Sequence, residues 1–377
     1  MGRYDMADWK VTKLQKKLIK QVLNSGRLTY GDKTRELENR FAEANGHQYA
    51  LFTSSGTSAL KIAINALKDK HGWQDGDEVI IPAVTFVATM NVVLMNNLKP
   101  VLVDVEKTTV NLDPKLIEAA ITPKTRAIIA VHLLGRPADM KSIMRIAKKH
   151  KLKVIEDSCE TMFIPVKPRG DVTCYSTYVA HLMVTGVGGF IATDDKKLAT
   201  VMRSMMFHGR DESYLNIDDN PKNIAKRFYF PRFGYSDRMT ELEAAIGLGE
   251  LEGWQDMITK RQANALHLMI GLYNHPIEFP FIAMETRLHA FMFFPFFVNK
   301  RDKLMQFMEK HGIQTRTMMP LTTQPLVQPY LKGKSFPAAD YVNEHGILIG
   351  CHQYMEDKDL DYIVKVIRRF YESANNR

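Results

Sequence analysis

The chain has 377 residues, which is long enough for two domains with sizeable cores. Its net charge is +9, but the basic residues are spread along the sequence and do not alternate with aromatic side chains, so we expect anionic small molecules and no nucleic acid as partners. No apolar run approaches the roughly 20 residues of a membrane span, and the three cysteines lack metal-ligand spacing, so we expect a cytoplasmic protein with no membrane partner and no metal site.

Helical and strand patterns alternate through the first two thirds of the chain. Leu37 and Phe41, four residues apart, predict a helix over 35–43. Farther along, short apolar runs predict buried strands, and the periodic segments between them predict helices. We expect strands at 49–53, 79–81, 100–105, 127–132 and 154–157, and helices at 59–67, 85–96, 114–121 and 139–150. Such alternation is typical of an α/β fold with a mostly parallel sheet covered on both faces.

The pattern changes beyond residue 253. We expect helices at 257–274, 302–311 and 360–373, a phenylalanine-rich strand at 291–298 and a proline-rich loop at 320–337. These elements predict a smaller α+β domain at 254–377 after a large cofactor-binding α/β domain at 1–253. The pattern leaves open whether a helix near the N-terminus packs on the smaller domain.

A serine-rich stretch opens the helix at 59–67. Gly56 lets the backbone approach a ligand closely, and the helix start offers unpaired N–H groups, so Gly56 and Thr57 are candidates for a phosphate site. Taken alone, the stretch is more typical of a plain helix cap with Ser55 as the N-cap.

Three further side chains follow predicted strand ends, where α/β sheets place their ligands. Phe86 could stack on a flat ring or pack in the core. Asp157 ends an apolar strand, and burying its carboxylate is costly unless a partner offsets the charge; a helix cap or a surface position is the alternative. Glu160 either reaches the same ligand or faces solvent.

A histidine follows in the segment 176–181, before a turn that contains Gly186, Gly188 and Gly189. The turn would bring the chain back into the sheet, and Ser176 could bind a phosphate through its hydroxyl group. A lone histidine is more often structural than catalytic, but the flanking pattern makes His181 a catalytic candidate.

Together these motifs resemble the DegT/DnrJ/StrS family of sugar aminotransferases almost from end to end. The resemblance implies the fold-type-I architecture of enzymes that depend on pyridoxal phosphate (PLP), with a large, mixed, mostly parallel sheet and a smaller C-terminal α+β domain. It also implies a homodimer with shared active sites. The matching segments are 30–31, 54–60, 82–91, 131–137, 156–158, 208–209 and 234–245.

The resemblance assigns one group of residues to the phosphate and the ring face of the cofactor. Gly56, Thr57 and Ser176 would hold the PLP phosphate, and Phe86 would cover the ring.

A second group would contact the rest of the cofactor. Asp157 would pair with the pyridine nitrogen, and Glu160 would lie near the ring hydroxyl. Ser236, at a position where the family usually has asparagine, would reach the phosphate of the partner subunit's cofactor. The segment 163–171 is shorter than in the family and would reshape the substrate side.

Position 181 carries the main departure, because most of the family has there a lysine that bonds covalently to PLP, which an imidazole cannot do. A small histidine-bearing branch includes GDP-4-keto-6-deoxymannose 3-dehydratase and a CDP-sugar dehydratase with a cysteine-bound iron–sulfur cluster. The three cysteines do not suit such a cluster, so the iron-free type is the better match.

The resemblance to this branch implies a reaction. The chain would use PLP or pyridoxamine phosphate (PMP), with glutamate as amino donor, to remove the C3 hydroxyl of a nucleotide-linked 4-keto-6-deoxy sugar. His181 would act as both base and acid, for which an ordinary histidine pKa of about 6.5 is suited.

Two other functions stay open. An ordinary nucleotide-sugar aminotransferase would need a lysine from elsewhere, such as Lys167. The departures at His181 and Ser236 also fit a PLP-binding homologue that has lost catalysis. Residues 291–295, His289 and Arg316 are further candidates for positions near the substrate.

Overall fold

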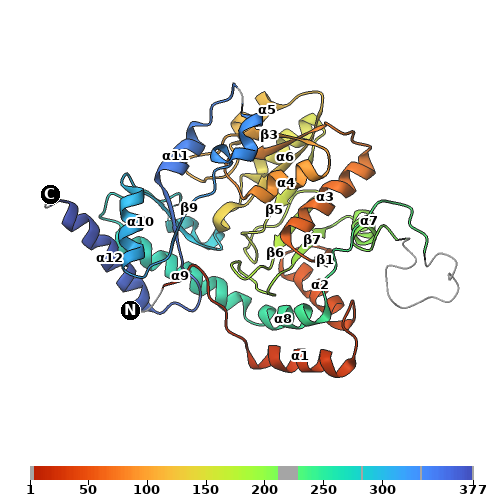
Figure 1. Ribbon diagram of the computed structural model, residues 1–377, viewed down its shortest axis with the longest axis horizontal. Helices are drawn as coiled ribbons and strands as arrows, with labels where there is room; N and C mark the ends of the chain where they lie inside the picture. The colour runs from red at the N-terminus through yellow and green to blue at the C-terminus, as the bar shows by residue number, and fades with distance from the viewer. Residues whose placement is uncertain (1–3, 211–227, 282, 332, 376–377) are drawn as a thin grey trace.

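A seven-stranded sheet forms the centre of the computed structural model, which describes residues 4–210, 228–281, 283–331 and 333–375 (Figure 1). The strand order is β1-β7-β6-β5-β4-β2-β3. Strands β2 to β6 run parallel, whereas β7 is antiparallel to both of its neighbours, so the predicted mostly parallel sheet is confirmed. The strands are β1 Tyr49–Thr53, β2 Glu78–Pro82, β3 Lys99–Val103, β4 Thr125–Val131, β5 Lys153–Asp157, β6 Val172–Ser176 and β7 Gly189–Thr193.

Helices cover both faces of this sheet. Side chains along a strand alternate between the two faces, and Ile80 and Ile128 pack with α5 and α6 while Ile81 and Ile129 belong to the core on the side of α3 and α4. The helices of this part are α1 Lys13–Ser25, α2 Asp32–Ala44, α3 Gly56–His71, α4 Val87–Met95, α5 Pro114–Ala120, α6 Met140–His150, α7 Lys196–Met206 and α8 Glu241–Leu251.

The turn from β1 into α3 explains how the start of α3 stays open to a ligand. Ser55 is the N-cap, and its hydroxyl accepts a hydrogen bond from Ser58 N at 3.0 Å. The helix ends at Gly72, whose left-handed backbone (φ 64°) suits glycine. The cap binds the N–H group of Ser58, the third residue of the helix. The N–H groups of Gly56 and Thr57 therefore remain available to a ligand.

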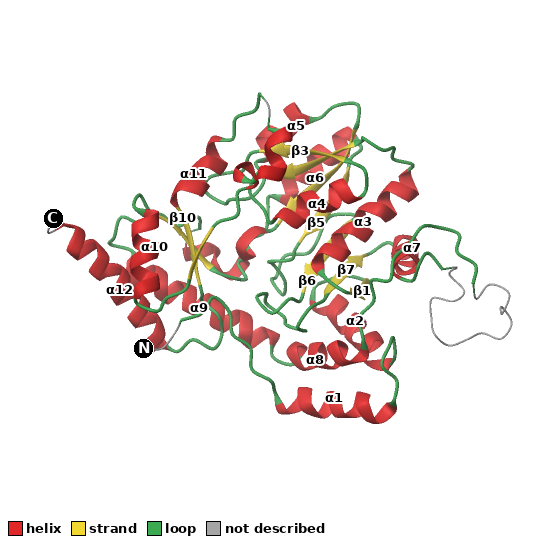
Figure 2. Ribbon diagram, viewed as in Figure 1, coloured by secondary structure: helices red, strands yellow, loops and turns green. Residues whose placement is uncertain are grey.

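The C-terminal part has its own core around a three-stranded antiparallel sheet of order β8-β10-β9. Figure 2 shows this small sheet beside α10 and α12, apart from the large sheet. Phe294 and Phe296 of β8 and Ile347 and Ile349 of β10 pack in this core against α9 and α12. The elements are α9 Trp254–Leu272, β8 Phe294–Phe297, α10 Arg301–Lys310, β9 Thr315–Thr317, α11 Pro337–His345, β10 Gly346–Ile349 and α12 Asp357–Asn375.

The N-terminal segment contacts both parts of the molecule. Gln15 of α1 donates to Ile246 O at 3.2 Å and to Glu250 Oε1 at 2.8 Å, both on α8. Before the helix, Tyr4 stacks on Tyr362 of α12 at 5.0 Å. The residues ahead of α1 therefore contact the C-terminal part, whereas α1 packs on α8. Among the described residues, no helix combines the length and the apolar character needed to cross a membrane.

Candidate active site

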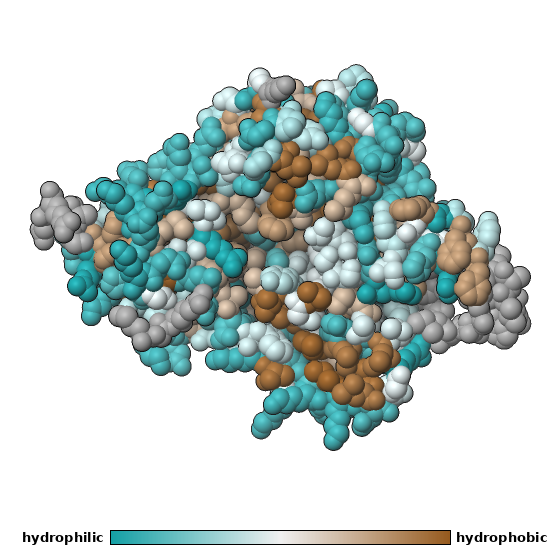
Figure 3. Space-filling view, in the orientation of Figure 1, coloured by the Kyte–Doolittle hydropathy of each residue, from teal (hydrophilic) through white to brown (hydrophobic). Residues whose placement is uncertain are grey.

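A cavity of about 370 Å³ opens at the carboxyl ends of the parallel strands, where the C-terminal part faces the large sheet. On the face shown in Figure 3, apolar surface gathers near α4 and over the region of α1 and α8, with a hollow between these patches and the C-terminal part. Seven of the eight predicted site residues line the cavity, and Ser236 does not. The seven are Gly56, Thr57, Phe86, Asp157, Glu160, Ser176 and His181.

Asp157 is the last residue of β5 and is 5% exposed. Its Oδ2 accepts a hydrogen bond from Thr89 Oγ1 at 2.9 Å, and its Oδ1 accepts one from Cys159 N at 3.2 Å. Burial raises the pKa of Asp157 above its usual range, although both hydrogen bonds act in the opposite direction. A cation in the cavity would favour the charged carboxylate, and a protonated pyridine nitrogen supplies such a charge.

Glycine is required at position 56 because the chain passes close to two other segments. A Cβ atom there would lie 2.7 Å from Cys159 Sγ and 2.8 Å from Ser176 Cβ. The close approach brings the start of α3 next to the end of β6, so its backbone N–H groups and the Ser176 hydroxyl face the same cavity. Backbone N–H groups at a helix start together with a hydroxyl group fit a phosphate.

His181 lies on the segment between β6 and β7, and its Nδ1 is 3.3 Å from Ser176 Oγ. The segment is closed by hydrogen bonds from Thr177 N to Gly188 O and from Val179 N to Gly186 O. Desolvation lowers the pKa of His181 to about 4. The expectation of an ordinary histidine pKa is therefore wrong, and His181 is a neutral imidazole near neutral pH.

Glu160 is 8% exposed and shows the opposite shift. Its Oε2 accepts a hydrogen bond from Leu134 N at 2.6 Å. Burial, with a contribution from the nearby Asp157 carboxylate, raises the pKa of Glu160 to about 7. A carboxyl group with this pKa can donate or accept a proton near neutral pH.

Phe86 is the N-cap residue of α4 and is 58% exposed. The alternative of core packing is therefore wrong, and the ring is available to a ligand in the cavity.

Two other sequence candidates lie elsewhere. Ser236 is exposed, and its Oγ accepts a hydrogen bond from Arg238 Nη2 at 3.0 Å. His289 is buried and stacks on Phe291 at 3.8 Å. A single subunit does not bring Ser236 to the cavity, so its role toward a partner's cofactor stays a prediction.

The cavity also contains residues outside the eight predicted site residues. Thr89 lies one helical turn after Phe86, and this spacing was the signal that could have identified it. Tyr178 also lines the cavity, and its half-exposed ring lies 6.1 Å from that of His181. Arg316 of β9 also lines the cavity, and the sequence analysis named it as a candidate near the substrate. Leaving His181 aside, Arg316 is the one cationic side chain among the described lining residues.

Lysine is absent from the described residues that line the cavity. Lys167, which a transamination mechanism could recruit, is exposed on the segment after β5 and does not line it. Within the described chain, no group of three or more His, Cys, Asp and Glu side chains is arranged to hold a metal ion.

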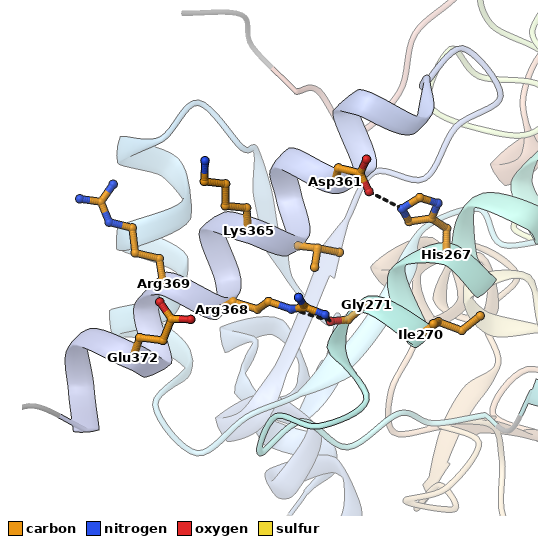
Figure 4. A pocket seen from close by; sticks show the side chains of 9 residues that line it. His267, Ile270, Gly271, Asp361, Lys365, Arg368, Arg369 and Glu372 are labelled. Atoms are coloured by element: carbon orange, nitrogen blue, oxygen red, sulfur yellow. Dashed lines mark hydrogen bonds and ion pairs between the residues drawn. The ribbon is translucent and has the colours of Figure 1, made fainter.

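A wider groove of about 770 Å³ lies between α9 and α12 (Figure 4). Three of its polar side chains, those of His267, Asp361 and Arg368, join the two helices to each other. His267 Nε2 and Asp361 Oδ1 are 2.8 Å apart, and Arg368 donates to Gly271 O, near the end of α9, at 2.9 and 2.6 Å. The groove lies away from the strand ends, so the smaller cavity is the better candidate for an active site.

Three comparisons relate this chain to known proteins. Residues 10–368 match the DegT/DnrJ/EryC1/StrS aminotransferase family. The spore coat polysaccharide biosynthesis protein SpsC of Bacillus subtilis is 29% identical over 373 residues, which cover 95% of this chain and 94% of that protein. The UDP-2-acetamido-2-deoxy-3-oxo-D-glucuronate aminotransferase of Pseudomonas aeruginosa is 33% identical over 353 residues, with 92% of each protein covered. The solved structure of E. coli GDP-4-keto-6-deoxy-D-mannose-3-dehydratase with bound hydrated PLP is 27% identical with a TM-score of 0.87, covering 97% of this chain and 100% of the other.

Proposed function

Because the chain belongs to the DegT/DnrJ/EryC1/StrS aminotransferase family, we propose that it is a sugar 3-dehydratase. It is a PLP-dependent enzyme whose cofactor is PLP or PMP. The proposed substrate is a nucleotide-linked 4-keto-6-deoxy sugar, which loses its C3 hydroxyl group. Glutamate is the proposed amino donor.

One observation carries this proposal: the described lining of the cavity offers an imidazole, that of His181, and no primary amine. An aminotransferase of this family needs a lysine that bonds to the cofactor. The likeness to the E. coli 3-dehydratase, at 27% identity over nearly the whole chain, supports the same choice.

The residues of the cavity divide the work of holding the cofactor. Gly56, Thr57 and Ser176 bind the phosphate, and Phe86 covers one face of the ring. Asp157 keeps the pyridine nitrogen protonated, which offsets the unfavourable burial of its own charge.

Two further residues complete the proposed site. Glu160 lies near the ring hydroxyl. Ser236 reaches the phosphate of the other cofactor in a homodimer, which is consistent with its position outside the cavity of its own subunit.

His181 is the proposed base and acid. Bound PMP supplies an amine for the C4 ketone of the sugar and a ring that withdraws electrons. Neutral His181 would hold the proton released from the C4′ carbon and would pass it to the C3 hydroxyl, which would leave as water. Positioned proton transfer of this kind typically accelerates a reaction by about 10²–10⁴-fold. The amino group would leave as ammonia. Oxidation of glutamate to 2-oxoglutarate would return to the cofactor the electron pair that the cofactor gave to the sugar.

The proposal is tested with purified protein, PLP, glutamate and a panel of 4-keto-6-deoxy sugar nucleotides. Mass spectrometry should detect a product that has lost one oxygen atom and kept its ketone, together with ammonia and 2-oxoglutarate. A product that has exchanged its ketone for an amino group would reject dehydration.

A nucleotide-sugar aminotransferase is the second candidate. It is favoured by the 33% identity to the Pseudomonas aeruginosa aminotransferase. It requires a lysine to reach the cofactor. Borohydride treatment of the PLP-loaded protein, followed by peptide mass spectrometry, would then yield a pyridoxyl-lysine peptide. For the dehydratase we expect no such peptide.

A further inference from the structure

The hydroxyl group of Ser176 lies between two nitrogen atoms of the segment that carries His181. Its Oγ is 3.3 Å from His181 Nδ1 and accepts a hydrogen bond from Tyr178 N at 3.4 Å. A serine hydroxyl has one proton to donate and two lone pairs. Because the Tyr178 N–H occupies one lone pair, the hydroxyl has one proton and one lone pair left for its remaining partners.

The direction of the hydrogen bond between Ser176 and His181 decides what the imidazole can do. A neutral imidazole carries one proton, on Nδ1 or on Nε2. If Ser176 donates to Nδ1, the proton sits on Nε2 and that nitrogen has no lone pair for a base. If Nδ1–H donates to Ser176, the Nε2 lone pair is free. Among the described residues, none hydrogen-bonds Nε2, so this atom is the one available for proton transfer.

A phosphate group would settle this choice because its ionised oxygens only accept hydrogen bonds. Ser176 lines the cavity with Gly56 and Thr57, so its hydroxyl proton can be donated to a phosphate bound at the start of α3. The remaining Ser176 lone pair then accepts from His181 Nδ1–H. We propose that Ser176 is a positioning residue that couples phosphate binding to the tautomer of His181 and leaves Nε2 as the base. The inference rests on the proposed function and deepens it.

The geometry of the segment favours a change of tautomer over a movement of the ring. Thr185 N donates to Thr177 O at 2.9 Å, and the hydroxyl groups of the same two residues are 2.6 Å apart. Val184 N also donates to Glu250 Oε2 of α8 at 3.3 Å. These contacts hold the backbone on both sides of His181, so the proton can move between ring nitrogens while Nδ1 stays beside Ser176.

The test is nitrogen NMR of protein labelled at its histidine ring nitrogens, with His181→Ala used to assign the His181 signals. Without phosphate, His181 Nδ1 is the one acceptor for the Ser176 hydroxyl proton among the described residues, so we expect Nδ1 to lack a proton in that state. After addition of PLP or of inorganic phosphate, we expect Nδ1 to carry one. A wild-type His181 whose Nδ1 protonation is the same with and without phosphate would overturn the inference, and this measurement needs no variant.

Variants separate the hydroxyl from the space it fills. In Ser176→Ala the phosphate-dependent change should disappear, and Ser176→Thr, which keeps a hydroxyl, should restore it. The exposed Ser335→Ala serves as a matched control and should behave as wild type. At saturating PLP, Ser176→Ala should lower kcat by about 10²-fold, within the range for positioned proton transfer, with a smaller effect on the KM for the sugar. A phosphate response that persists in Ser176→Ala would reject the coupling.

The experiments distinguish a failure of the tautomer coupling from a failure of the proposed function. A phosphate-dependent tautomer that depends on Ser176, in a protein that does not dehydrate sugars, would uphold the inference and reject only the function. Sugar dehydration with a His181 tautomer insensitive to phosphate would do the reverse.

Discussion

Glu160 and Leu134 are joined by a hydrogen bond of 2.6 Å from the Leu134 backbone N–H to Glu160 Oε2. Leu134 takes a left-handed backbone conformation (φ 61°), which is unusual for a residue other than glycine. The turn after β4 thus directs an N–H group at a carboxyl group on the segment after β5. The contact fixes one oxygen of Glu160, and Glu160 is among the residues that line the cavity.

The raised pKa of Glu160 predicts a stability effect that depends on pH. The folded-state pKa of about 7 exceeds the ordinary glutamate pKa of 4.5, so the stabilisation from a protonated Glu160 is fully present below pH 4.5 and is lost as the pH rises through 7. Above that pH the wild type should lose up to about 3 kcal/mol of unfolding free energy relative to Glu160→Gln. Urea unfolding at pH 5 and pH 8 measures the difference, and Glu344→Gln at an exposed site is the control. A difference between wild type and Glu160→Gln that is equal at both pH values would contradict the shift.

Replacing His181 by lysine tests whether an amine at this position is what the described cavity lining lacks for covalent binding of PLP. His181→Lys should bond covalently to PLP, because the new amine takes the place of the imidazole beside Ser176. Borohydride reduction should then give a pyridoxyl-lysine peptide at position 181 and none in wild type, and sugar dehydration should fall below detection. Lys167→Ala, at an exposed position, should retain wild-type dehydration. Loss of PLP binding in Lys167→Ala would revive the transamination mechanism.

Asp157→Asn should separate stability from catalysis. The amide keeps the shape of the carboxylate, and the Thr89 hydroxyl can turn from donor to acceptor. Because burial disfavours the charged carboxylate, the cofactor-free variant should be at least as stable as wild type in urea. Turnover should fall by about 10²-fold or more, since the fixed charge opposite the pyridine nitrogen is lost. A variant with unchanged turnover and a normal absorption spectrum of bound PLP would remove Asp157 from the site.

Phe86→Ala should weaken cofactor binding with little effect on folding. The side chain is 58% exposed, so its removal leaves no buried void. Loss of aromatic stacking worth about 0.5–1.5 kcal/mol should raise the Kd for PLP by up to about tenfold. Met95→Ala is a matched control, because Met95 is also 58% exposed and ends the same helix. Equal effects of the two substitutions on the Kd would refute the stacking role.

Local pattern was enough to predict most of the large sheet and its helices. The apolar runs of β2, β4 and β5 predicted buried strands. The helices between them begin at recognisable caps, such as Asp139 before α6. Ser55 also forms the predicted cap, and the cavity at the same helix start shows that a cap and a candidate phosphate site coexist there.

Other features depend on contacts between distant segments and left no local signal. β6 and β7 are strands because they pair with each other and with β5 and β1, of which β1 lies far away in the sequence. β9 has only three residues, which is too short for a recognisable pattern. The pKa shifts of His181 and Glu160 likewise arise from burial in the folded chain. Arg316 reaches the cavity because the small sheet brings it there, which spacing along the sequence does not reveal.

A cavity whose described lining has no lysine would retain its coenzyme through reversible contacts alone. Occupancy would then follow mass action and rise and fall with the free concentration of the vitamin-derived molecule. Dilution or dialysis would empty such a protein.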